Sequence, residues 1–562
     1  MILKRLGLVL LCYLCGCGRL GFEAMPPFEG ACRSDQDCPD GRCDLSQDPP
    51  ICVTLDGCGN GTVDTGEACD DGNQTDGDGC DSSCALEANQ VCTNDSDCAS
   101  GQCNTTTGQC VVSQSCQGCE INGTCFDTSE VNPTNACLFC DPSLASDSWQ
   151  SASAGTTCSG GGTCDGNGVC NALSTSFLAN GFLGDNDVLG SAIAISQDLM
   201  VVGAPSQDFY PNSGKAFIYQ QLANETWSML DADPLSGGMQ YLVASDSTIG
   251  NLFGGSVSIS GDDIAVGAYR ASTSQGPNRG AVYMFGRDVD GVWSETVKLE
   301  SPRASTSPYD DFGRKIIVDG DRLFVGESWP IGYLHYYERT AGTWTFKQSL
   351  QASNAQNNDR FAFAFAVEGN TLIIGAPGFS NGSDRGIVYR YSYVNGSWGS
   401  EQELDRGDQD GDIFGVAVAL EGDLAVIGAA ETDDGYTYVG PGYVRLYRLG
   451  TTATELATLT KPDQSNLGEG FGLSVDIRNG LILIGSPFDE TTGYQRAGAA
   501  FLFQPLSSTS YALSHVFVSP NTGPDDRFAE TCSFATGQSL FCACPYEFIT
   551  GQNEGRVYRF DY

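Results

Sequence analysis

Short apolar runs separated by tight polar turns dominate the chain from about residue 172 onward. The run Phe253-Gly-Gly-Ser-Val-Ser-Ile259 alternates in character, whereas Leu481-Ile-Leu-Ile-Gly-Ser486 is apolar almost throughout. Alternation is typical of a strand with one covered face, and a continuous apolar run is typical of a strand covered on both faces. A Gly-Asp turn such as Gly261-Asp262 joins the two runs, and a Gly-x-Val-Tyr run and a run starting near Trp follow. The pattern predicts units of four antiparallel strands.

This four-strand unit recurs seven times. The glycine that opens its third strand stands at Gly214, Gly280, Gly332, Gly386, Gly442, Gly498 and Gly555, at intervals of 52 to 66 residues. Seven such sheets stacked around an axis cover one another's apolar faces and protect their edges. The last copy supplies only three strands before Tyr562, so residues 174–178 are expected to add the fourth. We predict an all-β fold, a seven-bladed β-propeller over residues 172–562, preceded by small disulfide-rich modules.

The repeated units resemble the FG-GAP repeat, including that of the integrin α-chain propeller. The unit Asp412-Ile-Phe414-Gly415-Val-Ala-Val-Ala-Leu-Glu-Gly422-Asp-Leu-Ala-Val-Ile-Gly428 carries the resemblance, which extends over residues 173–562. The resemblance implies a propeller, a scaffold that hosts binders and enzymes alike. One copy departs from the pattern, because Gly326-Glu-Ser-Trp329-Pro330 replaces its Gly-Ala-Pro.

The calcium loop of the integrin-type repeat is not reproduced in most copies. Asp408, Asp410 and Asp412 do alternate, but they precede a first strand instead of following a second one. Carboxylate oxygens are the ligands that Ca²⁺ prefers, so these three residues are candidates for a structural calcium site. No other cofactor is expected.

The loop before each first strand and the loop between the second and third strands should lie on one face of the propeller, because neighbouring strands alternate in direction. Acidic and aromatic residues gather in these loops. The candidate ligand contacts are Asp187, Asp311, Asp359, Asp412, Asp526, Tyr210, Tyr436 and Tyr438. A ring of carboxylates would attract cations and basic partners. The alternative is that each acid only starts a turn.

Cysteines are concentrated ahead of the repeats. The chain has 26, of which twenty lie between Cys32 and Cys170, a density typical of a disulfide scaffold in an oxidising compartment. The candidate disulfide residues of the first modules are Cys32, Cys38, Cys43, Cys52, Cys58, Cys69, Cys80, Cys84, Cys92, Cys98, Cys103 and Cys110. The block from Cys58 to Cys84, with its Cys-Gly-Asn-Gly and Cys-Asp-Asp-Gly-Asn sequences, resembles the cysteine-rich repeat of myxobacterial surface proteins. We assign these modules to residues 32–171.

Two questions about cysteines stay open at this point, namely whether two Cys-x-x-Cys pairs bind zinc and which cysteine is bonded to Cys532. Zinc is an alternative for the Cys-x-x-Cys pairs Cys116/Cys119 and Cys137/Cys140, although export and the lack of nearby histidine oppose it. Near the C-terminus, Cys532 can pair with Cys542, which leaves Cys544 over, or with Cys544 itself.

The N-terminus carries an export signal. Two basic residues, Lys4 and Arg5, precede a short apolar run, as in a secretory signal peptide over residues 1–16. The sequence Leu14-Cys15-Gly16-Cys17 resembles the bacterial lipoprotein signal, which implies lipidation of Cys17 and a linker over residues 17–31. The alternative is an ordinary cleaved signal. We expect an exported outer-membrane or cell-surface lipoprotein, or a secreted protein, that meets a membrane only through its lipid anchor.

Charge and composition limit the function. The formal net charge is −42 and the sequence pI is about 4.1, which argues against nucleic acid as a partner. Only two histidines exist, and no reaction-specific motif stands out, so we predict no catalytic residue and no enzyme. The hypothesis is a recognition or adhesion protein whose loop face binds an extracellular protein or glycan. The alternatives are a propeller enzyme acting on polysaccharide, as a lyase or hydrolase, and a structural envelope protein.

Overall fold

The computed structural model describes residues 41–44, 51–54, 69, 103–104, 109–110 and most of 118–562. Within the last range it leaves out residues 122–123, 133–134, 159–161, 165, 167, 172–173, 178–186, 206–213, 224–225, 234–237, 240, 306, 308, 379–384, 431–439, 463–468, 491, 522 and 548–553. The expected signal peptide and the lipidation site Cys17 lie outside the described residues. No helix in the described part of the chain combines the length and the apolarity that crossing a membrane would require.

The chain divides into two compact units, residues 1–117 and 118–562. In the first unit, β1 (Gly41–Asp44) pairs with β2 (Ile51–Thr54), and β3 (Cys103–Asn104) pairs with β4 (Gln109–Cys110). These pairings place Cys43 opposite Cys52 and Cys103 opposite Cys110. The second unit begins before the predicted end of the cysteine-rich region at residue 171, and it also contains every repeated sheet.

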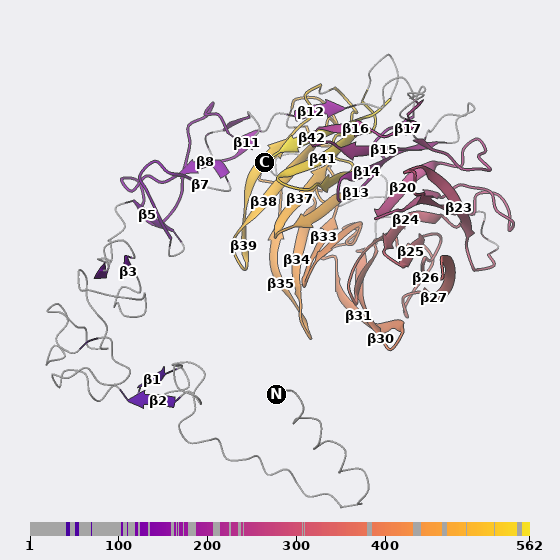
Figure 1. Ribbon diagram of the computed structural model, residues 1–562, viewed down its shortest axis with the longest axis horizontal. Coiled ribbons are helices and arrows are strands. Elements are labelled where there is room, and N and C mark those ends of the chain that lie inside the picture. Colours follow the sequence, from indigo (N-terminus) through magenta and orange to yellow (C-terminus); the bar gives the residue numbers. More distant parts are fainter. Residues whose placement is uncertain are drawn as a thin grey trace, which may run out of the picture. The chain divides into compact units, whose positions relative to one another are not determined.

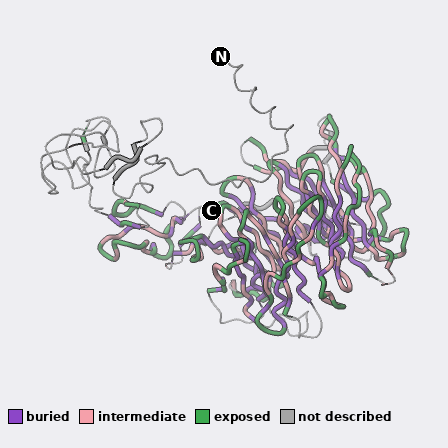
Figure 2. Tube along the Cα trace, turned by 90° about the horizontal axis from the view of Figure 1, so that it is seen from below, coloured by how far each residue is buried: buried purple, intermediate pink, exposed green. Residues whose placement is uncertain are grey.

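Each repeated sheet is an antiparallel meander of strands in chain order. In sheet 2, β20 (Phe253–Ser260), β21 (Asp263–Ala268), β22 (Ala281–Arg287) and β23 (Trp293–Glu300) pair in that order. The apolar second strand is buried almost throughout, whereas in the fourth strand only Trp293 is buried and the other residues are exposed or part-buried. Figure 2 shows this division, with buried strand segments and exposed turns at their ends. The all-β prediction and the four-strand unit are confirmed.

The described residues form seven such sheets. Sheet 1 contains β13 (Ala192–Ser196), β14 (Leu199–Ala204), β15 (Lys215–Gln221), β16 (Trp227–Met229) and β19 (Tyr241–Leu242). Between β16 and β19, β17 (Asp231–Asp233) and β18 (Gly238–Met239) form a separate hairpin. Sheet 3 contains β24 (Phe312–Asp319), β25 (Arg322–Glu327), β26 (Tyr333–Thr340) and β27 (Thr343–Leu350). Sheet 4 contains β28 (Ala364–Glu368), β29 (Thr371–Ala376), β30 (Ile387–Val394) and β31 (Ser397–Arg406).

The remaining sheets follow the same order. Sheet 5 contains β32 (Ala417–Glu421), β33 (Leu424–Ala429), β34 (Tyr443–Leu449) and β35 (Ala453–Leu459). Sheet 6 contains β36 (Ser474–Arg478), β37 (Leu481–Ser486), β38 (Ala499–Ser507) and β39 (Ser510–Phe517). Sheet 7 contains β40 (Cys532–Phe534), β41 (Ser539–Cys544), β42 (Arg556–Asp561) and β12 (Ser174–Phe177).

The first strands of the seven sheets contact one another in chain order, and β40 of the last sheet contacts β13 of the first. A hydrogen bond from the Thr531 hydroxyl to the Ser191 carbonyl, 3.2 Å long, spans the same junction. In Figure 1 the C-terminal strands β41 and β42 accordingly lie beside β13, β14 and β15. The succession of sheets therefore returns to its start, as a propeller requires.

Strand β12 completes the last sheet. Its residues pair antiparallel with β42, from Ser174 opposite Phe560 to Phe177 opposite Val557. The first and last repeats are thereby held together by main-chain hydrogen bonds, and the expectation that residues 174–178 supply the missing strand is confirmed.

Glycine lets neighbouring sheets approach closely. A Cβ atom on Gly428 of β33 would lie 2.0 Å from the carbonyl oxygen of Gly472, just ahead of β36, and Gly375 meets Gly415 in the same way. These distances are too short for any side chain. The glycines of the Phe-Gly and Gly-Ala motifs are thus required by contact between repeats.

The last cysteine module belongs to the second unit and joins sheet 6. It contains β5 (Cys119–Ile121), β6 (Thr124–Phe126), β7 (Val131–Asn132), β8 (Asn135–Phe139), β9 (Gln150–Ser151), β10 (Thr163–Cys164) and β11 (Cys170–Asn171). Strand β11 pairs in parallel with β39, which places Cys170 opposite His515 and extends sheet 6.

Disulfides hold this module and the last repeat. The bonds are Cys119–Cys140, Cys137–Cys164, Cys158–Cys170 and Cys532–Cys542. The pairing near the C-terminus is therefore Cys532 with Cys542, and Cys544 is a buried free thiol whose pKa is raised by burial. Cys69 is also disulfide-bonded, whereas the side chains of the other eleven candidate cysteines lie outside the described residues.

Candidate functional site

Four of the acids predicted at the loop face stand two residues before the first-strand Phe or Leu, namely Asp187, Asp359, Asp412 and Asp526, whereas Asp311 stands directly before Phe312. Asp187, Asp412 and Asp526 have exposed fractions of only 2% each. The backbone N–H of Gln409 donates to Asp412 over 3.0 Å, and that of Gln356 donates to Asp359 over 2.6 Å. Asp359, Asp412 and Asp526 thus each accept a hydrogen bond from the backbone N–H three positions earlier, which closes the loop ahead of the first strand.

The residue directly before the Phe or Leu has a positive φ in all seven repeats, and it follows an acid in six of them and Asn251 in the other. The set is Val188, Leu252, Asp311, Arg360, Ile413, Gly470 and Arg527, with φ between 42° and 69°. Such backbone is costly for residues with a side chain and persists only where its surroundings hold it. The buried acid that closes the turn supplies that support. The buried acids Asp187, Asp412 and Asp526 therefore have a structural place in their loops, and their role as ligand contacts stays a prediction.

Basic side chains neutralise several of the buried acids, two of them from the start of a third strand and one, Lys461, from just after a fourth strand. Lys215 lies 3.4 Å from Asp187, and Arg279 lies 2.7 Å from Asp310. Lys461 pairs with Glu469 and also lies 2.6 Å from Asp489. Because these charges are paired inside the loops, the field of the acids at the loop face is weaker than their number suggests.

The three candidate calcium ligands have different partners. Asp408 pairs with Arg445, the Asp410 carboxylate lies 3.0 Å from Arg385, and Asp412 accepts a 2.7 Å hydrogen bond from the Tyr443 hydroxyl. Burial and the bond to Asp412 together raise the pKa of Tyr443. Each of the three carboxylates is thus held by a different side chain, and the calcium site stays a prediction.

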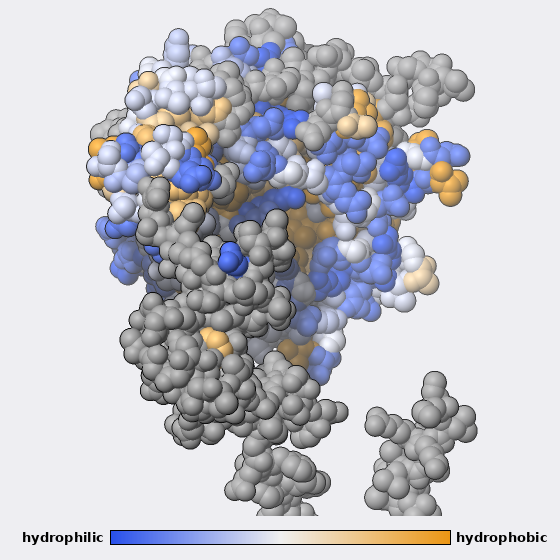
Figure 3. All heavy atoms as spheres, turned by 60° about the vertical axis from the view of Figure 1, so that its left-hand side comes forward, coloured by the Kyte–Doolittle hydropathy of each residue, from blue (hydrophilic) through white to orange (hydrophobic). Residues whose placement is uncertain are grey.

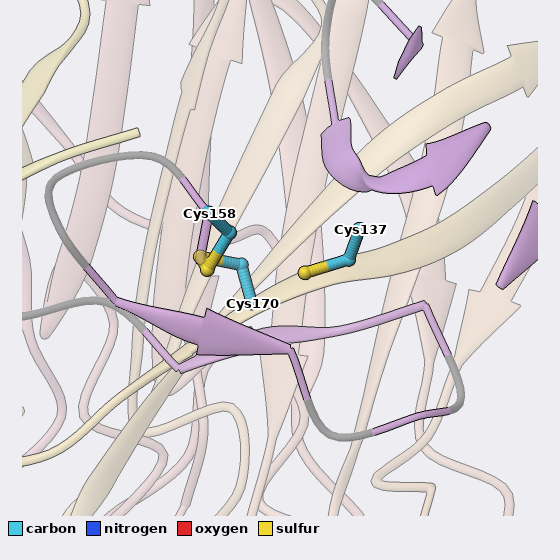
Figure 4. Close-up of side chains that lie close together, drawn as sticks. All are labelled: Cys137, Cys158 and Cys170. Carbon is cyan, nitrogen blue, oxygen red and sulfur yellow. A yellow bond between two sulfur atoms is a disulfide. The ribbon is translucent and has the colours of Figure 1, made fainter. Parts of the chain in front are cut away.

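One cluster of metal-type ligand atoms occurs among the described residues. The sulfur atoms of Cys137, Cys158 and Cys170 lie within 4.8 Å of one another. Figure 4 shows the bonded sulfurs of Cys158 and Cys170 with the sulfur of Cys137 directed toward them. All three cysteines are in disulfides, so the cluster is two neighbouring bridges and offers no thiolate. The Cys119–Cys140 and Cys137–Cys164 bonds likewise exclude zinc at Cys137/Cys140.

Arginine and aromatic side chains meet on the loop face of sheets 2, 3 and 4. We call Tyr269, Arg270, Tyr309, Arg314, Trp329, Arg360 and Phe363 the arginine–aromatic surface. The guanidinium of Arg270 lies 4.6 Å from the ring centre of Tyr309. That of Arg314 lies 5.1 Å from the Tyr269 ring and 5.0 Å from the Phe363 ring.

Trp329 extends this surface from the third repeat. The guanidinium of Arg360 lies 4.9 Å from the Trp329 ring, and the backbone N–H of Trp329 donates to the Asp310 carbonyl over 3.2 Å. Tyr309 is 43% exposed, and the side chains of Arg270 and Arg314 are about one-third exposed. The surface is therefore open to solvent, and its rings and guanidinium groups hold one another in place.

Asp311, a predicted ligand contact, lies among these arginines. Its carboxylate is 3.4 Å from Arg270 and 3.8 Å from Arg314. It thus orients two guanidinium groups of the surface. Tyr210, Tyr436 and Tyr438 lie outside the described residues.

The unusual third repeat has a structural explanation. Glu327, which stands where other copies have Ala in Gly-Ala-Pro, is fully buried and bonds the His335 Nε2 atom over 2.9 Å. It also pairs with Arg303, whose guanidinium lies 3.4 Å from the Tyr333 ring centre. This network anchors the loop that carries Trp329 to the arginine–aromatic surface.

A second arginine–aromatic contact lies between sheets 6 and 7. Arg527 is 4.4 Å from the Tyr546 ring and 5.4 Å from the Phe488 ring. Arg527 and Tyr546 line a hollow of about 570 Å³ together with Asp525. In Figure 3, which shows one face of the molecule, the described surface is mostly hydrophilic, with apolar residues in isolated spots and recesses.

Comparison with known proteins agrees with the repeat pattern. The model of the FG-GAP repeat family matches residues 184–219, 237–285, 344–391 and 398–444. The chain carries FG-GAP repeats. The recognition of these repeats from the sequence is confirmed, while the likeness to the lipoprotein signal and to the myxobacterial cysteine-rich repeat stays a prediction.

The FG-GAP region is similar to part of integrin alpha-7. Rat (Rattus norvegicus) integrin alpha-7 is 27% identical over 154 residues, 26% of this chain and 13% of the relative. The mouse (Mus musculus) protein is 27% identical over 169 residues, 29% of this chain and 13% of the relative. The human (Homo sapiens) protein is 27% identical over 150 residues, 25% of this chain and 12% of the relative. The chain thus spans about an eighth of the length of these relatives.

Solved structures that are similar to the chain include the RRP9 WD40 repeats, with a TM-score of 0.41 and 10% identity over 69% of this chain and 97% of that chain. The mitotic checkpoint complex gives a TM-score of 0.42 with 13% identity over 69% of this chain and 95% of that chain.

Proposed function

We propose that this protein is a recognition or adhesion module that binds an extracellular protein through the arginine–aromatic surface of its loop face. The FG-GAP repeats and the similarity to part of integrin alpha-7 are consistent with a ligand-binding adhesion role. The disulfides agree with a location outside the cytosol. Export through residues 1–16 and anchoring through a lipid on Cys17 are part of the proposal, which assigns no catalytic residue.

The arginine–aromatic surface is the observation that supports this proposal. Tyr, Trp and Arg are enriched at protein interfaces and provide most of the strongly contributing contacts. Here Tyr309, Trp329 and three arginines come from adjacent loops that buried acids hold in fixed turns. A surface that is already ordered loses less conformational entropy when a partner binds.

A structural Ca²⁺ at Asp408, Asp410 and Asp412 also belongs to the proposal. Because Arg445 and Arg385 pair with two of these carboxylates, calcium would have to compete with both guanidinium groups. Millimolar CaCl₂ should raise the unfolding temperature of the protein, and Asp410→Asn should abolish the rise while MgCl₂ has a smaller effect. An equal rise of the unfolding temperature in Asp410→Asn would show that calcium does not bind at this site.

The test of the function uses the full mature chain in a binding screen against arrayed extracellular proteins and glycans. For a protein that binds, the double variant Tyr309→Ala/Arg314→Ala should weaken affinity at least about tenfold, as loss of a strongly contributing contact does. The control is Arg448→Ala, which removes a surface arginine paired with Asp423 at the opposite ends of the strands. Binding that survives the double variant, or that is confined to glycans, would contradict the proposal.

A further inference from the structure

Three buried ionic side chains meet where sheets 5 and 6 adjoin. Lys461 follows β35 of sheet 5 by two residues, whereas Glu469 lies in the loop before β36 and Asp489 in the loop between β37 and β38 of sheet 6. The two sheets lie side by side, with β35 in contact with β39 (Figure 1). The side chains of Lys461, Glu469 and Asp489 are 4%, 2% and 0% exposed. The group is therefore almost completely shielded from bulk water.

The amine of Lys461 is held against both carboxylates. It donates a hydrogen bond to Glu469 Oε2, and its Nζ atom lies 2.6 Å from Asp489 Oδ2. Because a carboxyl C–O bond is about 1.2 Å long, the Cγ atom of Asp489 is at most about 3.8 Å from Nζ. Reacting atoms about 3 to 3.5 Å apart are in a near-attack arrangement. A small movement is therefore enough to bring the amine to the carboxyl carbon.

Hydrogen bonds to the backbone fix the two acids. The Ser486 hydroxyl donates to the Glu469 carbonyl over 2.9 Å, and the Phe488 N–H donates to the same oxygen over 3.0 Å. The Gly498 N–H donates to the Asp489 carbonyl over 3.0 Å. The two acids thus come from loops of one repeat that are tied to each other, and the lysine comes from the repeat before. Holding the reacting groups in place in this way supplies much of the rate of an intramolecular reaction.

We propose that Lys461 and Asp489 condense to an intramolecular amide and that Glu469 transfers the protons. Glu469 takes a proton from the Lys461 ammonium and passes it to a carboxylate oxygen of Asp489. The neutral amine then attacks the Asp489 Cγ atom, and the carbonyl π electrons move to the oxygen. Glu469 carries a second proton from the nitrogen to the leaving hydroxyl, and the C=O bond re-forms. One water departs, the Nζ–Cγ bond remains, and Glu469 is again a carboxylate.

Burial of the group favours the amide over the ion pair. Burial by itself would lower the pKa of Lys461, but the hydrogen bonds and charges of Asp489 and Glu469 more than offset this, so the pKa is raised and the resting amine is an ammonium. The reaction must therefore begin with the proton transfer to Glu469. A buried ion pair seldom recovers the hydration that its two ions lose, whereas the amide carries no charge. Exclusion of water also protects the product from hydrolysis.

The experiment is peptide mass spectrometry of the full mature chain after incubation at pH 7, reduction and alkylation. Trypsin releases residues 449–478, which contain Lys461, and residues 479–496, which contain Asp489. In the wild-type protein these two peptides should be joined, at one water less than their summed mass. Fragmentation of the branched product gives two N-terminal series, which distinguishes it from a linear peptide left uncleaved at Arg478.

Variants separate the roles of the three residues. Lys461→Arg and Asp489→Ala remove the reacting groups and should abolish the branched product. Glu469→Gln keeps the size of the side chain but cannot transfer protons, so it should contain at least about ten times less of the product at the same time after expression. The control Asp187→Asn changes an acid that is paired with Lys215 in another repeat, and it should leave the amount unchanged.

The result with the wild-type protein does not depend on whether any variant folds. Absence of the branched product from the folded wild-type protein would overturn the proposal. An unaltered amount in Glu469→Gln, with folding verified by circular dichroism, would overturn the role of Glu469. The binding of a partner at the loop face is not needed for the reaction, so its outcome is independent of the proposed function.

Discussion

Single residues in this protein act mainly through their contacts with the neighbouring repeat. The buried acids close the loops before the first strands, and basic residues such as Lys215 and Arg279 neutralise two of them. Glycines such as Gly428 let the backbone of the next repeat approach to a distance that no side chain would allow. The cost of a substitution should therefore depend on whether the residue faces the next repeat.

Gly428→Ala tests this dependence. The added Cβ would lie 2.0 Å from the Gly472 carbonyl oxygen, so the two sheets must separate, and we expect a loss of about 2 to 4 kcal/mol in the free energy of unfolding. The control is Gly422→Ala, at a turn with a φ of 59° and no atom within 4 Å of the added Cβ. It should cost only about 1 kcal/mol of backbone strain. Chemical denaturation measures the free energy of unfolding of both variants. Equal losses of this free energy would show that the contact between repeats is unimportant.

His515 gives a prediction about pH. It is 1% exposed beneath the pairing of β11 with β39, and burial lowers the pKa of His515 to about 4. Between pH 6.5 and pH 4 the unfolded chain binds a proton that the folded imidazole does not, so stability falls as the pH falls through this window. His515→Gln lacks this titration. The stability advantage of the wild-type protein over the variant should shrink by about 2 to 3 kcal/mol from pH 7.5 to 4.5. A constant difference in denaturation would mean that the imidazole binds a proton as readily in the folded protein as in the unfolded chain.

At the scale of elements, two short segments ahead of the repeats hold the last sheets. Strand β11 adds to the outer strand of sheet 6, and β12 adds to the outer strand of sheet 7. Both cover strands whose edges would otherwise be open to pairing with another chain. The second pairing could be predicted by counting strands in the last copy. The first could not, because β11 has only two residues and lies in a cysteine module with its own disulfides.

The contribution of β12 can be measured with Thr175→Pro/Ser176→Pro. Neighbouring residues of a strand point their N–H groups in opposite directions, so one of the two prolines must remove a hydrogen bond to β42. We expect a loss of about 3 kcal/mol or more in the free energy of unfolding. The matched variant Thr175→Val/Ser176→Val keeps every N–H and should be nearly neutral. If both variants unfold at the wild-type temperature, β12 does not hold the first and last repeats together.

At the scale of the whole molecule, the strand pattern, the repeat and its FG-GAP resemblance could be predicted, because each repeat carries the same local signals. The loop-face chemistry could not be predicted in full. The sequence places an acid before six of the seven first strands, but it does not reveal that Lys215 and Arg279 neutralise two of these acids from other strands. Nor does it show that Arg270 and Arg314 meet aromatic rings of other loops, or that Lys461 meets Asp489 of the next repeat. These neighbours are created by the order of sheets around the axis. In the sequence, the only local signal of the arginine–aromatic contacts is an arginine directly after the acid, at Arg360 and Arg527.

The net charge of −42 leads to a prediction about salt. Acidic groups outnumber basic ones by 70 to 28, so even complete ion pairing leaves most carboxylates facing other carboxylates. Their repulsion destabilises the compact state, and salt screens it over roughly 10 Å at 0.1 M ionic strength. The unfolding temperature should therefore rise between 10 mM and 500 mM NaCl at pH 7, although salt weakens exposed ion pairs such as that of Arg385 with Asp410.

At pH 4, where part of the carboxylates are protonated, the rise should be smaller. Sucrose at equal osmolality serves as the uncharged control. An unfolding temperature that falls with salt at pH 7 would mean that the paired charges contribute more to stability than the repulsion among the remaining carboxylates takes away.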